Sequence, residues 1–161
     1  MTRRRALFVS GCALLAAAGA RGAGAADGKA PTVGISVIHA LRTDGGLSID
    51  PQLRDLPQLT KDQPFVRYNV FRLLDRKELP LARGKAVAYP VIDGRTLQLT
   101  LVDVTPSSGE PRYHVRAEIA GAGKREFLKL LEVTAGPNEP FFVAGQAHAG
   151  GTLFLELAIH P

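Results

Sequence analysis

The feature that most constrains this chain is a series of short stretches in which apolar and polar residues alternate, each ended by turn-forming residues. In one stretch the apolar side chains occupy every second position, at Tyr113, Val115, Ala117 and Ile119. In a second stretch Leu153, Leu155, Leu157 and Ile159 alternate with a face that contains Thr152, Phe154, Glu156, Ala158 and His160. Successive side chains of a strand point to opposite faces of a sheet, so this period of two predicts strands with one buried and one solvated face.

The same reading extends over most of the chain and predicts nine strands. They are expected near residues 33–41, 65–74, 77–82, 85–90, 95–104, 112–120, 126–134, 140–146 and 152–160. Asp93 followed by Gly94, between two apolar runs, is the strongest hairpin signal. Asp50 before Pro51 predicts a short helix near residues 51–56, with Pro57 ending it. The fold class expected is all-β, an antiparallel β-sandwich of about 8–9 short strands with one short helix.

The first 25 residues have the pattern of an export signal. Three arginines precede an apolar run over residues 6–20, and small residues at Ala23 and Ala25 form a cleavage site. The run is shorter than the roughly 20 apolar residues that a membrane-spanning helix needs. We therefore expect a signal peptide over residues 1–25, a flexible extension over 26–32 and a single β-sandwich domain over 33–161.

Two alternatives concern how the chain is exported. Residues 9–12, which end in Cys12, match the pattern before a lipidated cysteine, and a lipoprotein attached through Cys12 is the minor alternative. Arg4 and Arg5 before a weakly apolar segment also resemble a twin-arginine signal, and the choice between this route and the general secretory route stays open. Either route implies a bacterial protein that is periplasmic or secreted.

Charge and cysteine content exclude several function classes for the processed chain. The full sequence has 20 basic and 15 acidic side chains, but the first 25 residues hold four of the arginines and no acid. The processed chain would then carry a formal charge of only +1, too little clustered charge for nucleic-acid binding. Cys12 is the one cysteine, so cleavage after Ala25 would also remove any thiol for disulfides, zinc or nucleophilic catalysis.

The remaining side chains show no motif for a metal or cofactor. Histidines occur at positions 39, 114, 148 and 160, and no two are closer than 12 residues, unlike the short spacings of metal ligands. We expect no cofactor. His114, Arg116 and Glu118 share one face of a predicted strand, where they form either an acid/base row or, as we favour, a solvated charged face.

The function expected is that of an exported, non-enzymatic binding or accessory module of the bacterial cell envelope, with a protein or peptide partner. The alternative is a small exported enzyme that uses His and carboxylate groups on a sheet face. Sandwiches have edge strands that can accept another strand, and proline or dense charge marks such edges. The segments 77–82 and 85–90 therefore predict a binding surface that includes Arg76, Lys77 and Lys85. A second candidate surface is the predicted hairpin tip over residues 146–151, with Gln146 and His148.

Overall fold

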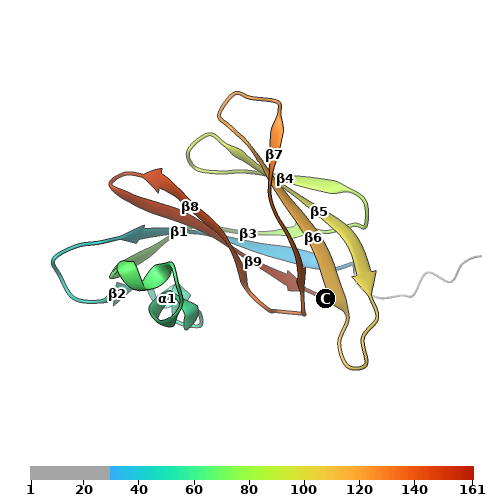
Figure 1. Ribbon diagram of the computed structural model, residues 1–161, viewed down its shortest axis with the longest axis horizontal. Helices are drawn as coiled ribbons and strands as arrows, with labels where there is room; N and C mark the ends of the chain where they lie inside the picture. The colour runs from blue at the N-terminus through green and yellow to red at the C-terminus, as the bar shows by residue number, and fades with distance from the viewer. Residues whose placement is uncertain (1–29) are drawn as a thin grey trace, which may run out of the picture.

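The computed structural model describes residues 30–161, and their strands form two sheets (Figure 1). One sheet has five strands in the order β2-β3-β1-β9-β8, which span Ser48–Ile49, Val70–Pro80, Thr32–Leu41, Gly151–His160 and Phe141–His148. The other has the order β4-β5-β6-β7, which span Ala86–Pro90, Thr96–Thr105, Arg112–Ala120 and Phe127–Ala135. The expected signal peptide, its cleavage site and Cys12 lie outside the described residues.

The expected fold class is confirmed. Residues 30–161 contain nine strands, one short α-helix and two sheets. Neighbouring strands are antiparallel, except that β2 runs parallel to β3 for two residues. The hairpin predicted at Asp93 and Gly94 joins β4 to β5, with Gly94 in the left-handed conformation (φ 80°) that the turn requires.

The main hydrophobic core lies between the two sheets. The alternating apolar residues of β6 point into it, and Val115 and Ala117 have no exposed surface. Leu155 and Leu157 of β9 face them from the other sheet. The period of two thus identified the buried face of both strands correctly.

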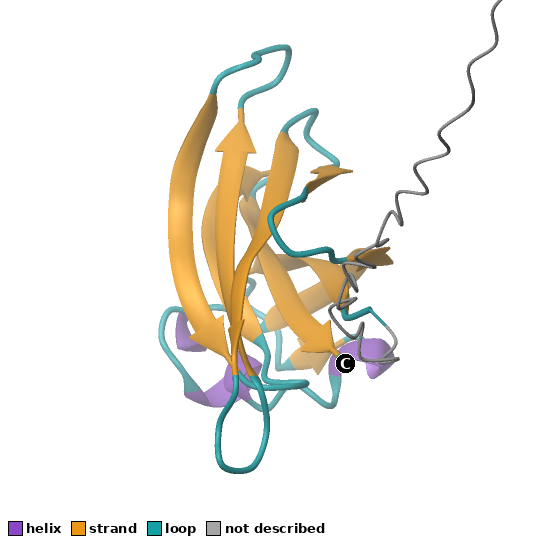
Figure 2. Cartoon of the chain, turned by 90° about the vertical axis from the view of Figure 1, so that its right-hand side faces the viewer, coloured by secondary structure: helices purple, strands orange, loops and turns teal. Residues whose placement is uncertain are grey.

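A second hydrophobic core covers part of the outer face of the five-stranded sheet, and the sequence analysis missed it. The segment between β2 and β3 contains two 3-10 turns, η1 (Pro51–Leu53) and η2 (Phe65–Arg67), and the helix α1 (Gln58–Lys61). This segment packs against the sheet on the side away from β4–β7 (Figure 1), at one end of the strands (Figure 2). Phe154 of β9 is therefore only 2% exposed, and the prediction that β9 has one solvated face is wrong.

Three expected elements also need correction. The strands expected over 65–74 and 77–82 are one strand, β3, because the charged residues after position 74 pair with β1 and do not form a turn. Residues 65–67 are a 3-10 turn, since Phe65 belongs to the outer core. The helix near 51–56 is the 3-10 turn η1, capped by Asp50 as expected, while Pro57 precedes α1 and does not end a helix.

The structure gives one finding that bears on membranes. Within residues 30–161, no helix has the length and apolar character needed to cross a bilayer.

Candidate functional site

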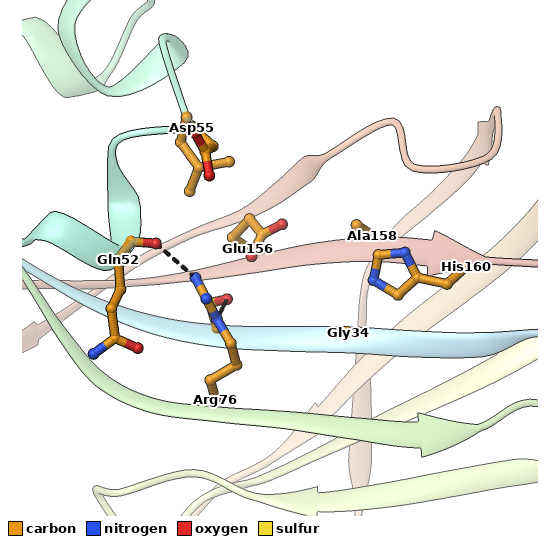
Figure 3. Close-up of a pocket in the computed structure, with 9 residues that line it drawn as sticks. Gly34, Gln52, Asp55, Arg76, Glu156, Ala158 and His160 are labelled. Atoms are coloured by element: carbon orange, nitrogen blue, oxygen red, sulfur yellow. Dashed lines mark hydrogen bonds between the residues drawn. The ribbon is translucent and has the colours of Figure 1, made fainter.

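A polar hollow of about 230 Å³ lies on the outer face of the five-stranded sheet, next to the outer core (Figure 3). Its floor comes from three adjacent strands, whose contributing residues are Gly34, Ser36, Arg76, Glu156, Ala158 and His160. Its wall is the helical segment, through Gln52, Asp55 and Leu56. Side chains that are far apart in the sequence thus surround one cavity.

Strand register explains why a hollow forms at this place. Ser36 lies opposite both Arg76 and Glu156, so the three residues form a row across the sheet. The next row pairs Gly34 with Ala158. Small side chains at these central positions leave open space on β1, and the longer side chain of Arg76 reaches over β1 toward Glu156 (Figure 3).

Glu156 is the least expected residue of the hollow. It is only 8% exposed, yet among the described residues it has no hydrogen-bond partner and no cation within 4.0 Å. The residue lines the hollow, so its carboxylate can be reached from there. Glu156 therefore has free capacity to accept hydrogen bonds from a group that enters the hollow.

Arg76 supplies the positive charge of the hollow. Its Nε donates to Ser36 Oγ at 3.1 Å, and its Nη2 donates to the backbone oxygen of Gln52 at 3.1 Å. These bonds fix the guanidinium at the side of the cavity, and three of its N–H groups remain unused among the described residues. Asp55, on the wall, is likewise in no ion pair with the described residues.

His160 closes the far end of the hollow. Its Nδ1 lies 2.7 Å from Oδ1 of Asn138, so Nδ1 donates and Nε2 is left as an acceptor in the neutral ring. Nε2 is 2.8 Å from the position that a Cβ at Gly34 would occupy. Glycine at position 34 thus lets the imidazole lie over β1.

The predicted binding residues Arg76, Lys77 and Lys85 lie at or next to an edge of a sheet. On its outer side β3 pairs with β2 only at Val70 and Phe71, so Lys77 belongs to the free part of an edge strand. Lys85 precedes β4, the edge strand of the other sheet, and both lysines are exposed. Arg76 is on β3 as well, but its guanidinium is bonded within the hollow.

The predicted hairpin tip is shorter than expected. Strand β8 continues to His148, and β9 begins at Gly151, so Gln146 and His148 are strand residues and the tip is residues 149–150. His148 accepts a hydrogen bond through its backbone oxygen from Nε2 of the buried His39, at 3.0 Å, and the two rings pack edge to face. Gln146 lines a small gap in the core between the sheets. These contacts hold both residues in the fold and do not present them as a flexible loop.

His114 and Glu118, on which the enzyme alternative depends, lie on the outer face of the four-stranded sheet but contact different residues. His114 Nε2 is 2.9 Å from Glu132, and Glu118 accepts a hydrogen bond from Gln98 at 3.4 Å. Glu132 also pairs with Arg116 and Lys129. The hydrogen bond from Lys129 is the main reason that the pKa of Glu132 lies below its ordinary value, and Arg116 lowers it further.

Sequence reasoning missed Glu156, Asp55 and His160 as members of one site. Glu156 and His160 were placed on the solvated face of their strand together with Phe154 and Ala158. Phe154 and Ala158 are apolar, and their presence on a face predicted to be solvated was the available signal that another segment covers this face. The register that aligns Arg76, Ser36 and Glu156 could not be obtained from local pattern.

Comparisons with protein-family models, with curated proteins and with solved structures found no match. Within residues 30–161, no three His, Cys, Asp or Glu side chains are arranged to hold a metal ion. The functional argument therefore depends on the geometry of the sheets themselves.

Proposed function

We propose that this chain is an exported, non-enzymatic binding module of the bacterial cell envelope that holds a protein or peptide partner along the free edge of β3. The observation that carries the proposal is the short overlap of β2 with β3. Of the 11 residues of β3, only Val70 and Phe71 pair with β2. From Arg72 to Pro80 no described strand pairs with β3 on that side, although η1 contacts β3 and Arg76 bonds to Gln52 there. Beyond this contact the outward N–H and C=O groups can accept an added strand.

Charge along this edge supports a partner with acidic residues. The two acidic side chains of β3 are engaged within the fold: Asp75 accepts from the Tyr89 hydroxyl at 2.6 Å, and Glu78 accepts from Thr32. Lys77 and Lys85 are exposed and form no ion pair with the described residues. Neither hydroxyl neutralises its carboxylate, but Arg72, Arg76 and Lys77 outnumber the two acidic residues of β3. The small positive excess would steer an acidic, extended segment to the edge.

The cellular location in this proposal comes from the leader pattern of residues 1–25. It implies a periplasmic or secreted protein, with lipidation at Cys12 as the alternative. Binding is favoured over the enzyme alternative because His114 and Glu118 are each engaged by a different neighbour on an open face. Catalysis would need such groups to converge on one reacting atom.

Capture of envelope proteins by the purified protein tests the proposal. A photo-crosslinking residue at position 77 should give a discrete crosslinked species in envelope extracts, and the same probe at position 124 should not. The double change Lys77→Glu with Lys85→Glu should reduce that species at least tenfold and weaken its dependence on salt. Arg76 is left unchanged because it belongs to the hollow.

The control is the double change Lys124→Glu with Arg125→Glu, which reverses two exposed charges in the connection between β6 and β7. It should leave capture intact. If capture survives the change at 77 and 85 but is lost on substitution of Gln146 and His148, the partner binds at the β8–β9 end and the edge proposal is wrong.

A further inference from the structure

The polar hollow contains both kinds of charge, and neither charge is neutralised within the fold. Glu156 on β9 and Arg76 on β3 are in the same cross-strand row, and they are not within 4.0 Å of one another. Adjacent strands are about 4.8 Å apart, so the two residues stand about 10 Å apart at their Cα atoms. The Arg76 side chain extends over Ser36, to which its Nε donates, and Glu156 lines the hollow beyond it.

Three hydrogen-bond acceptors line the hollow at different places along it. Glu156 lies between Arg76 and His160, and Asp55 faces the floor from the wall (Figure 3). The Glu156 carboxylate can accept from an ammonium group, and the negative charge of Asp55 favours a cation in the same hollow. Because Glu156 is more than nine-tenths buried, a cation beside it would replace a missing partner and would not compete with an existing ion pair.

Arg76 can bind an anion within the same hollow. Arg76 is oriented by Ser36 and by the backbone of Gln52, and its unused N–H groups can donate to a carboxylate in the two-pronged geometry typical of arginine. The cavity volume of about 230 Å³ is below the roughly 300–1,000 Å³ of sites for drug-sized ligands. Size and charge together limit the ligand to a small molecule with both charges close together.

We propose that the hollow on the outer face of the five-stranded sheet binds a free α-amino acid, with its ammonium group on Glu156 and its carboxylate on Arg76. Asp55 adds negative charge to the hollow, and Leu56 and Ala158 provide apolar surface for a small side chain. This site is independent of partner binding at the edge of β3, since Lys77 and Lys85 do not line it.

Three probes separate the charges of the ligand. L-alanine carries both groups, L-alaninamide only the ammonium, and N-acetyl-L-alanine only the carboxylate. In an NMR titration of the ¹⁵N-labelled protein, L-alanine should shift the amides of Gly34, Ser36 and Ala158 in a saturable way. Each single-charge probe should bind at least tenfold more weakly, since it lacks one of the two charge-assisted contacts.

Variants identify the residues that hold each group. Glu156→Gln should weaken L-alanine binding at least tenfold, and Arg76→Gln should remove the preference for L-alanine over L-alaninamide. Glu118→Gln, which removes the same charge from the outer face of the other sheet, should leave the affinity unchanged. The double change at Lys77 and Lys85 should also leave the affinity for L-alanine unchanged. The amino-acid site can therefore be confirmed even if the edge proposal is wrong.

Several results would overturn the assignment. One is the absence of saturable shifts with L-alanine; another is equal affinity for L-alanine and either single-charge probe. Unchanged affinity in a folded Glu156→Gln protein would show that its carboxylate does not hold the ammonium group. Circular dichroism of each variant checks that it is folded, and Glu118→Gln provides the matched reference.

Discussion

The outer faces of the two sheets have similar charged residues, but within residues 30–161 these residues form ion pairs on one face and not on the other. On the four-stranded sheet, Glu132 contacts His114, Arg116 and Lys129, and all four side chains reach solvent. On the five-stranded sheet, Glu156 is buried and has no such partner among the described residues. The difference comes from what covers each face.

The contribution of a charged side chain to stability depends on whether other parts of the fold cover it. Exposed ion pairs contribute little, because water already solvates both groups. The helical segment between β2 and β3 shields part of the five-stranded sheet, and Glu156 there is largely covered without an ion-pair partner among the described residues. A covered charge without a partner is therefore a better indication of a binding site than a row of exposed ones.

Removal of the aromatic contact beneath the helical segment should have the largest effect. Phe154 packs edge to face on Phe65 at 4.8 Å and on Tyr68 at 5.6 Å. Phe154→Ala should lower the free energy of unfolding by about 3–5 kcal/mol, because it leaves a cavity in the outer core. Denaturant unfolding measures the change.

Leu128, which is 64% exposed on β7, provides the control. Leu128→Ala should cost less than about 0.5 kcal/mol. Equal losses for the two variants would mean that the outer core does not stabilise the fold, and the contrast between the two faces would fail.

Much of the inner core could be predicted from the sequence, whereas the outer core could not. The alternation at Val115 and Leu155 is a local property, and it identifies their buried face without any knowledge of neighbouring strands. Whether the opposite face is covered depends on where the chain between β2 and β3 returns. The leucines and Phe65 of that segment read locally as a helix and a strand, and only tertiary packing made them a cover for Phe154.

The candidate site could be predicted from the local sequence pattern even less well than the outer core. Arg76 was identified from its position in a charged segment, but as part of an edge surface. Its neighbours in space, Ser36 and Glu156, are 40 and 80 residues away in the sequence. Their alignment depends on the register of β1 with two strands, including a shift at Val37 and Ile38, which no local pattern specifies.

A buried hydrogen bond between the sheets tests whether burial determines how much a polar contact contributes to stability. Tyr89 is 2% exposed, and its hydroxyl donates to Asp75 at 2.6 Å. Burial raises the pKa of Tyr89 above its ordinary value of 10, and the hydrogen bond and charge of Asp75 raise it further. Tyr89→Phe should lower stability at pH 7 by about 1–2 kcal/mol through loss of this bond.

The pH dependence of that difference has a defined sign. A group whose pKa is raised in the folded state contributes stability below its unfolded value, and the contribution is lost as the pH rises. The wild-type protein should therefore lose more stability than Tyr89→Phe above pH 10, and the two unfolding midpoints should converge. Midpoints that diverge as the pH rises above 10 would contradict the assignment.

The smallest effect is expected on the exposed face, at Glu132. Its pKa is lowered chiefly by the hydrogen bond from Lys129, so the folded state favours the charged carboxylate. Its contribution should be present at neutral pH and lost as the pH falls below the ordinary carboxyl value of 4.5. Glu132→Gln should lower the melting temperature slightly at pH 7 and leave it equal to wild type at acid pH.

Salt near 1 M, where the Debye length is about 3 Å, should remove most of the difference in melting temperature at pH 7 as well. Lys129→Met should reproduce the loss, because it removes the largest partner of the carboxylate. A difference that persists in high salt and at acid pH would mean that Glu132 acts through packing, and the exposed face would then resemble the covered one.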